Sequence, residues 1–355
     1  MSKNLSSPLR GRGALGNPDN RYAAWQNEAI DDGWGSLDVP VEPLRTTLTR
    51  DASKTIISYN SSPDVPFDRS INPYRGCEHG CVYCFARPTH AYLGLSPGLD
   101  FETQLFYKPD AASLLRGELD KKSYRPQPVM LGINTDAWQP AERQLGITRQ
   151  VLEVLQAYRH PVGIVTKSAL IERDLDILTE MAQANLVSVA ISITTLDRSL
   201  SRTLEPRAAA PQRRLEVVRR LADAGIPVGV LVAPLIPVLT DSELETIMEA
   251  SREAGASYAG YVLLRMPLEI EGLFEQWLRA HAPLKAEHVL SRMRDCHGGK
   301  SYDTRFGERM RGNGPYAELI AQRYRSARKK FALDHHAPLD TAQFKRPGDS
   351  QLELF

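Results

Sequence analysis

The chain has 355 residues, of which 42% are apolar and 25% charged, and its formal net charge is +1. This composition is typical of a soluble globular protein, and the balanced charge indicates no class of partner. No apolar run reaches the roughly 18 residues of a membrane span, and the N-terminus lacks the apolar core of a signal peptide. We therefore expect a cytoplasmic protein, with no membrane association, whose cysteines stay reduced.

The two ends of the chain differ in composition from the part between them. Residues 1–60 are rich in Gly, Pro, Asn, Asp and Ser, which predicts an extended or partly disordered N-terminal arm, ordered only where it lies against the body. Residues 61–300 carry the regular pattern of a folded body. We expect residues 301–333 to form a basic helical segment and residues 334–355 a flexible tail ending in QLELF.

Within the body, short apolar runs alternate with amphipathic stretches. Near-continuous apolar runs are typical of strands buried on both faces of a parallel sheet, and they occupy residues 128–134, 162–168, 186–194, 227–236 and 258–266. The amphipathic stretches have apolar residues at i, i+3, i+4 and i+7, which predicts helices over residues 143–158, 172–184, 211–225, 241–255 and 272–282.

With a first strand just before Cys77, these elements make about six β–α units. Gly225 and Gly255 suit the ends of two of the helices, and Pro211 suits a first helical turn. We expect an α/β fold, a partial (β/α)6 TIM-type barrel with parallel strands, and a doubly wound open sheet is the alternative. In such barrels the chemistry lies on the loops at the carboxyl ends of the strands.

The stretch RGCEHGCVYCFARPTH contains three of the four cysteines, Cys77, Cys81 and Cys84, at spacing C-x3-C-x2-C. Thiolates are soft ligands, so the cluster indicates zinc or iron–sulfur. His90 would complete a four-ligand zinc site. An iron–sulfur cluster normally takes four cysteines, so three would leave one iron open to another ligand, as a catalytic site requires.

This stretch resembles the signature of the radical S-adenosylmethionine (SAM) enzymes, C-x3-C-x-φ-C with an aromatic φ, which is Tyr83 here. More narrowly, residues 66–320 are similar to the spore photoproduct lyase branch, through INPYRGCEHGCVYCFA, VTK, AISITTLDRSLSRTLEP, QRRLEVVRRLADAG and VLVAP. The resemblance implies that the three cysteines hold a [4Fe–4S] cluster and that SAM binds its fourth iron. It also implies an electron donor such as flavodoxin or ferredoxin, and a 5′-deoxyadenosyl radical that takes a hydrogen atom from the substrate.

The resemblance also suggests residues for SAM. Thr135 and Asp136 follow the second strand, where the superfamily places a glycine-rich element that this chain lacks, and a capping role is the alternative. Lys167 ends the third strand and would pair with the SAM carboxylate, or with a carboxylate of the protein. The remaining candidates are Ser192 for the ribose and Tyr83 with Phe85 for the adenine, and core packing is the alternative for all three.

Two residues concern the hydrogen donor. Spore photoproduct lyases resemble this chain around residue 134 but carry a donor cysteine there, where this chain has Asn134. Cys296 is the remaining cysteine and is either an alternative donor or a structural thiol. A lyase-type splitting of thymine dimers is therefore in doubt, whereas SAM cleavage is not.

Three segments indicate partners. Residues 305–330 carry eight Lys or Arg against two Glu, with Tyr316 and Tyr324 among them, which suits a phosphate backbone or a solvated helix. RGRG at residues 10–13 adds to the nucleic-acid interpretation. QLELF, from Gln351 to Phe355, resembles the peptide by which repair proteins bind the DNA sliding clamp, and docking onto the protein's own body is the alternative.

The sequence therefore predicts a radical SAM enzyme that acts on nucleic acid, in DNA repair or modification. A radical SAM enzyme acting on a protein or small molecule is the second interpretation. A zinc-dependent binding module without enzymatic activity is the third.

Overall fold

The computed structural model describes residues 9–22 and 44–348. Its main sheet has seven strands in the order β10-β9-β8-β7-β6-β3-β2, and all neighbouring strands are parallel except β2 and β3. The strands are β2 (Ile57–Tyr59), β3 (Arg69–Ile71), β6 (Val129–Leu131), β7 (Val162–Thr166), β8 (Val187–Ser192), β9 (Val228–Leu235) and β10 (Tyr258–Leu263). The six parallel strands confirm the predicted α/β fold with a parallel sheet, here an open partial barrel with β2 and β10 at its edges.

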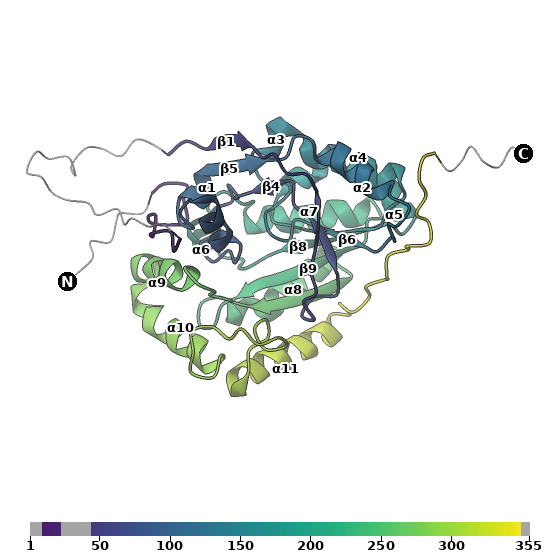
Figure 1. Cartoon of the computed structure of the whole chain (residues 1–355). Helices are drawn as coiled ribbons and strands as arrows, with labels where there is room; N and C mark the ends of the chain where they lie inside the picture. The colour runs from purple at the N-terminus through teal and green to yellow at the C-terminus, as the bar shows by residue number, and fades with distance from the viewer. Residues whose placement is uncertain (1–8, 23–43, 349–355) are drawn as a thin grey trace, which may run out of the picture.

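Helices cover the outside of this sheet (Figure 1). They follow the strands in the alternation that the periodicity predicted, and Gly225 and Gly255 have positive φ just beyond two of them, as C-cap glycines do. The helices packed along the sheet are α2 (Ala111–Leu119), α4 (Ile147–Ala157), α5 (Leu175–Gln183), α7 (Pro211–Asp223), α8 (Leu244–Glu253) and α11 (Gly314–Lys330). Every residue of β8 is buried between these layers.

We call the end of the barrel formed by the carboxyl ends of the six parallel strands the mouth, and the opposite end the base. Short helical elements and connections gather at the mouth, on the left of Figure 1. They include η1 (Arg87–Leu93), α1 (Asp100–Thr103), α3 (Glu142–Leu145), η2 (Ala169–Asp174), α6 (Arg198–Leu204), η3 (Asp241–Glu243), α9 (Ile270–His281) and α10 (Pro283–Asp295).

A small second sheet lies beside the first barrel strand. It consists of β1 (Thr47–Arg50), β4 (Tyr74–Arg75) and β5 (Gln104–Tyr107), in the order β1-β5-β4. The strand directly before Cys77 is β4, so the sequence placed the first barrel strand a few residues too late. The cysteine loop, residues 76–86, therefore begins directly after β4 of this second sheet, and not after a strand of the barrel.

The described part of the N-terminal arm packs against the body. Residues 12–15 are buried, and β1 and β2 both lie before residue 60. Arg12 donates to the backbone oxygens of Glu102 and Leu44. The RGRG segment is therefore used in part for packing within the chain, and Arg12 is not free to contact nucleic acid.

The segment after α11 crosses the base of the barrel as a strap, residues 331–348. Leu333 accepts a hydrogen bond from the backbone of Ala259, at the start of β10, and Phe344 packs against Tyr158 and His160. The prediction of a flexible tail from residue 334 is thus wrong for this stretch, because its aromatic and backbone groups bind the base. The QLELF peptide lies outside the described residues.

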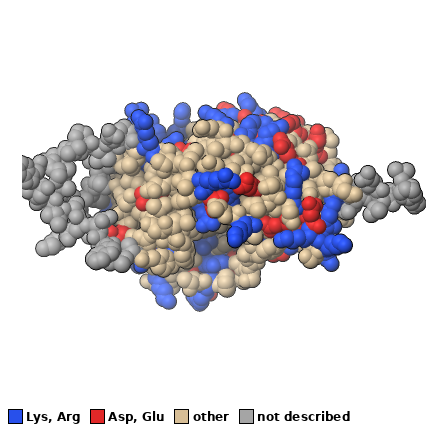
Figure 2. Space-filling view, turned by 45° about the horizontal axis from the view of Figure 1, so that its top comes forward, with Lys and Arg blue, Asp and Glu red and all other residues tan. Residues whose placement is uncertain are grey.

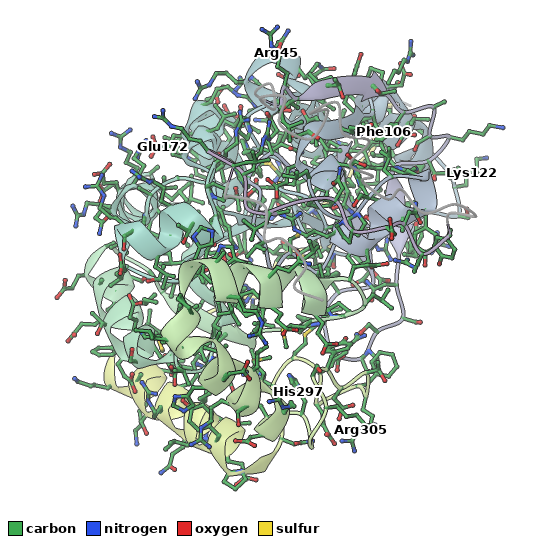
Figure 3. All side chains as sticks on the ribbon, turned by 90° about the vertical axis from the view of Figure 1, so that its left-hand side faces the viewer. Arg45, Phe106, Lys122, Glu172, His297 and Arg305 are labelled. Atoms are coloured by element: carbon green, nitrogen blue, oxygen red, sulfur yellow. The ribbon has the colours of Figure 1, made fainter. Side chains whose placement is uncertain are left out.

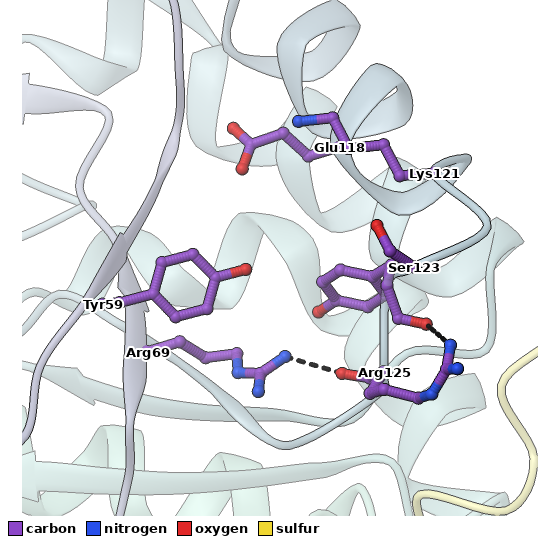
Figure 4. A pocket seen from close by; sticks show the side chains of 7 residues that line it. Tyr59, Arg69, Glu118, Lys121, Ser123 and Arg125 are labelled. Carbon is purple, nitrogen blue, oxygen red and sulfur yellow. Dashed lines mark hydrogen bonds between the residues drawn. The ribbon is translucent and has the colours of Figure 1, made fainter.

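A cavity of about 270 Å³ at the base is lined by Tyr59, Arg69, Tyr124 and four neighbours, and Figure 4 shows Arg69 bonded to the Arg125 carbonyl oxygen across it. Lys and Arg are interspersed with Asp and Glu on the face in Figure 2. No helix among the described residues is long and apolar enough to cross a membrane.

Candidate active site

A buried ion pair holds the cysteine loop in its conformation. The fully buried Arg87 pairs with Glu102 at 2.5 Å. The same guanidinium donates at 2.8–3.1 Å to the backbone oxygens of Gly80, Cys81, Pro97 and Gly98. A planar group with five donors can hold several carbonyl groups at once, so this one side chain shapes the loop.

The N-terminal segment closes over the same ion pair. The backbone N–H groups of Gly13 and Ala14 donate to the Glu102 carboxylate at 3.0 and 2.9 Å. A Cβ atom on Gly13 would lie 1.9 Å from the Gly80 carbonyl oxygen, so only glycine fits at this contact. The arm is therefore part of the wall behind the cysteines.

The three thiols lie close enough to influence one another; Cys77 and Cys81 are buried and Cys84 is half-buried. Burial raises the pKa of Cys81 to about 12, and it also raises the pKa of Cys77 and Cys84. Backbone N–H groups of Asp136 and of residues 86 and 87 act in the opposite direction on Cys77 and Cys84. Such thiols become stable thiolates only beside strong positive charge, which the irons of a cluster supply.

The residues fit a cluster better than a single zinc ion. No group of three or more His, Cys, Asp or Glu side chains in residues 9–22 and 44–348 is arranged to hold one metal ion. His90 is engaged elsewhere, since its Nε2 lies 2.9 Å from the Gln104 carbonyl oxygen and its ring packs on Phe101. A [4Fe–4S] cluster binds each thiolate to a different iron and so needs no such compact set.

Asp136 lies directly behind the cysteine loop, after β6. Its carboxylate accepts hydrogen bonds from the Thr166 hydroxyl at 2.8 Å and from the Lys167 backbone at 2.8 Å, and it lies 3.3 Å from the His79 ring. Burial alone would raise the pKa of Asp136, but His79 and these donors lower it overall. Asp136 therefore joins the loop to β7, and Thr135 likewise bonds the Tyr74 carbonyl oxygen at 3.0 Å.

Lys167 reaches from β7 across the mouth towards β8. Its Nζ donates to Ser192 Oγ at 2.7 Å and lies 3.8 Å from Glu205 Oε1. Ser192 in turn donates to the Ala233 carbonyl oxygen at 2.9 Å. The structure thus brings Lys167 and Ser192, both suggested to bind SAM, into contact, and the Glu205 carboxylate of the protein lies beside them.

Glu205 is the centre of this polar network. The fully buried Arg214 and the hydroxyl of Tyr83 both bond its carboxylate, and Thr194 donates to it at 2.9 Å. Burial alone would raise the pKa of Glu205, but the charges of Arg214 and Lys167 lower it to about 2. The neighbouring Arg207 does not join this network and pairs with Glu78 at 3.1 Å.

The two aromatic residues of the motif lie in different surroundings. Tyr83 is buried, and its bond to Glu205 ties the cysteine loop to α6, which favours the packing alternative over a place beside adenine. Phe85 is 40% exposed, and the guanidinium of Arg265 lies 5.2 Å from its ring centroid. Phe85 therefore belongs to the accessible surface of the mouth.

Neither candidate hydrogen donor contacts the three cysteines directly. Asn134 is exposed, and its backbone N–H donates to Asn72 at 3.1 Å. Cys296 is fully buried in the main core at the end of α10, and burial raises its pKa to about 11. These surroundings favour the structural alternative for Cys296.

The basic segment divides between the two ends of the barrel. The backbone of Met310 accepts from Leu263 at the end of β10, so residues 297–313 lie at the mouth. The last turn of α11 lies at the base, because Asp334 bridges Tyr258 at the start of β10. Of the predicted basic helical segment, residues 314–330 form α11, which runs the length of the barrel and buries Tyr324.

Sequence reasoning missed the residues that support the cysteine loop. Arg87 and Glu102 carry no periodic signal, and Gln139, which bonds the backbone of Glu78 and Gly76, lies far from both in the chain. His79 also belongs to this supporting set, through its contact with Asp136. Only the three-dimensional contact of the loop with the neighbouring strand ends reveals these roles.

Comparison with known proteins identifies the family. The sequence profile of the radical SAM superfamily matches residues 71–250, which include the cysteine loop and most of the barrel. The chain belongs to the radical SAM superfamily. It is accordingly a radical SAM enzyme, and the family implies SAM and an iron–sulfur cluster as its cofactors.

Relatives of this radical SAM enzyme include uncharacterised proteins. One from Mycobacterium tuberculosis is 39% identical over 281 residues, which cover 78% of this chain and 79% of that protein. One from Acidianus two-tailed virus is 30% identical over 195 residues, 52% of this chain and 64% of that protein. Neither name states a substrate.

Among solved structures, the fold is similar to that of spore photoproduct lyase. One structure matches with a TM-score of 0.59 at 17% identity, over 80% of this chain and 79% of that chain. Another, in complex with dinucleoside spore photoproduct, matches with a TM-score of 0.58 at 16% identity over 80% and 79%. At such identity the likeness concerns the fold.

Proposed function

We propose that this enzyme holds a [4Fe–4S] cluster on Cys77, Cys81 and Cys84, cleaves SAM reductively and acts on nucleic acid. The observation that carries the proposal is the convergence at the mouth of three thiols on one loop with Lys167 and its partners. When bound, the cluster passes one electron to SAM, which yields methionine and a 5′-deoxyadenosyl radical. Flavodoxin or ferredoxin would supply that electron.

The protein's own residues position the cofactor and exclude water. Lys167 carries a positive charge on the cluster side of the network, where the SAM carboxylate would find a charge-assisted hydrogen bond. Ser192 and Thr194 present hydroxyl groups beside it and keep their own bonds to the Ala233 carbonyl oxygen. Asp136 accepts a hydrogen bond from the Lys167 backbone and so orients this residue, whose ammonium group bonds Ser192 Oγ and would offer a further donor to the cofactor.

Nucleic acid is favoured as the substrate by two lines of support. The fold resembles that of spore photoproduct lyase, which has been solved with a dinucleoside photoproduct. In addition, arginines and exposed aromatic rings border the mouth, among them Phe85 and Phe306, and aromatic rings with cations suit unstacked bases and phosphates. The Gln351–Phe355 peptide would bind the sliding clamp and bring the enzyme to DNA. The reducing cytoplasm suits such chemistry.

Asn134 argues for a reaction other than the splitting of thymine dimers by the lyase route. Its amide lacks the transferable hydrogen of a thiol, and Cys296 lies in the core. We therefore favour a modification or repair reaction that ends without a thiol donor from residue 134. A protein or small-molecule substrate is the second candidate.

Deuterium transfer tests the substrate class. The reduced, cluster-loaded enzyme is incubated with SAM and either deuterated bacterial DNA, deuterated RNA or deuterated cell protein, and 5′-deoxyadenosine is analysed by mass spectrometry. We expect deuterium from DNA or RNA. Deuterium from protein alone would overturn the nucleic-acid proposal and leave the radical chemistry in place.

A further inference from the structure

Arg265 stands beside the cysteine loop, at the mouth of the barrel. It follows β10 by two residues, and its guanidinium lies 5.2 Å from the ring centroid of Phe85, which comes directly after Cys84. A group attached to this arginine would therefore lie beside the loop that holds the cluster. No motif of the sequence analysis pointed to this residue.

The surrounding structure holds the Arg265 side chain in place. Its guanidinium also lies 6.0 Å from the Tyr302 ring centroid and donates to the Tyr302 hydroxyl at 3.4 Å. Tyr302 packs edge-on against the buried His297, at 6.3 Å between ring centroids. Figure 3 labels His297 and Arg305, both from the connection between α10 and α11, in the lower part of the view. A guanidinium fixed between two aromatic rings loses little further side-chain entropy on binding a ligand.

Arg265 differs from its basic neighbours in having no carboxylate partner. Arg305 pairs with Asp303 at 2.6 Å, and Arg309 pairs with Asp64. Within residues 9–22 and 44–348 no ion pair is formed by Arg265, and its buried Nε has no hydrogen-bond acceptor. Asp64 is close enough for Arg265 to lower its pKa, but Arg309 and the Gly307 backbone already bond its oxygens.

A partly buried guanidinium without a counter-ion favours an anionic ligand. Desolvation of a charge is unfavourable unless the charge is paired, and Arg binds phosphate through two parallel hydrogen bonds. The ring of Phe85 beside Arg265 is 40% exposed, and that of Phe306, which faces Arg309, is 59% exposed; both offer apolar surface of the kind on which a base stacks. A phosphate flanked by bases meets both requirements.

We propose that Arg265 binds a phosphodiester group of the nucleic-acid substrate and so sets the distance between the substrate strand and the cysteine loop. The inference rests on the proposed function, and it assigns a substrate-binding residue to the same mouth. Lys167 serves the cofactor on the β7–β8 side, and Arg265 serves the substrate on the β10 side. The SAM carboxylate and the substrate phosphate would then bind two different positive charges on opposite sides of the mouth.

The test compares Arg265→Gln with wild type, both loaded with cluster. Fluorescence anisotropy measures the affinity for a short single-stranded oligodeoxynucleotide over a series of salt concentrations. We expect about a tenfold loss of affinity for Arg265→Gln, and a salt slope smaller by about 0.7, the value for one phosphate contact. Arg265→Lys should recover most of the slope and part of the affinity, because it keeps the charge and loses the two-donor geometry.

Arg328→Gln is the matched control, because Arg328 is exposed on the last turn of α11 at the base. An oligonucleotide with a neutral methylphosphonate backbone should bind Arg265→Gln and wild type equally. Equal affinity and slope for Arg265→Gln and wild type on natural DNA would overturn the inference. So would weaker SAM binding by Arg265→Gln with unchanged DNA binding, which would assign the arginine to the cofactor. If wild type itself binds no nucleic acid, the proposed function fails first.

Discussion

Lys167 is the residue on which cofactor binding depends most in this account. Its side chain is only 17% exposed, and its ammonium group bonds Ser192 Oγ and lies 3.8 Å from Glu205. Glu205 is already satisfied by Arg214 and two hydroxyl groups. The lysine therefore keeps hydrogen-bonding capacity for a second anion.

We predict that Lys167→Gln weakens SAM binding about tenfold or more while the cluster remains, because a charge-assisted hydrogen bond is lost. Equilibrium dialysis with cluster-loaded protein measures the affinity, and the iron content verifies the cluster. Lys122→Gln, an exposed lysine at the base, is the control. Unchanged affinity in Lys167→Gln would remove this residue from the cofactor site.

A second prediction at the residue scale concerns the contribution of Glu205 to the free energy of unfolding. Its pKa of about 2 lies below the value of about 4.3 for an unfolded chain, so its ionised form stabilises the fold above the higher value. This stabilisation is lost as the pH falls through the region between them. Glu205→Gln leaves Arg214 buried without its partner and should cost on the order of 3 kcal/mol at neutral pH.

Urea unfolding of Glu205→Gln and wild type, from neutral pH down to about pH 3, which lies between the two pKa values, measures this difference. We expect the gap between the two unfolding free energies to narrow as the pH falls. A gap that is constant with pH would show that Glu205 is not held ionised by its neighbours.

At the scale of elements, the N-terminal segment and the C-terminal strap are attached to opposite ends of the barrel. The periodicity predicted every parallel strand from β6 to β10 within a few residues, because strands buried on both faces are continuously apolar. It did not predict β1, β2 or the strap. These short segments are stabilised by contacts with distant residues, which no local pattern reveals: β1 pairs with β5, the backbone of Ile57 in β2 donates to Glu118, and the strap packs on Tyr158.

Gly13→Ala is predicted to displace the N-terminal segment from the cysteine loop. The added Cβ would meet the Gly80 carbonyl oxygen at 1.9 Å, and backbone on both sides cannot yield without a shift. We expect faster loss of iron to a chelator and faster tryptic cleavage after Arg12. Gly117→Ala, in α2 with open space around its Cβ, should match wild type in both assays. Equal iron loss in the two variants would contradict the role of the segment.

Phe344→Ala is predicted to weaken the strap and leave the mouth intact. Phe344 packs against Tyr124, Tyr158 and His160 but is only partly buried, so a loss of about 2 kcal/mol is expected. Thermal unfolding measures it, with the exposed Lys345→Ala as control. SAM affinity should stay at the wild-type value, since the base lies at the other end of the strands. A drop in SAM affinity would show coupling between the two ends.

At the scale of the whole molecule, the barrel separates a chemical end from a structural end. The sequence could nominate the cysteines and Lys167 as site residues because spacing and strand-end positions can be read along the chain. Arg265, Arg87 and Glu102 were not, because their roles arise from folding that brings residues from separate β–α units together. The net charge of the chain also gives no indication that the basic segment, residues 305–330, is divided between the mouth and the base.

The central claim is that the three cysteines generate a radical from SAM. The most direct measurement is the yield of 5′-deoxyadenosine after anaerobic cluster reconstitution and chemical reduction, compared for wild type, Cys81→Ser and Cys296→Ser. We predict that wild type and Cys296→Ser form 5′-deoxyadenosine and methionine, and that Cys81→Ser forms neither. No product from cluster-loaded wild type, or equal product from Cys81→Ser, would contradict the account.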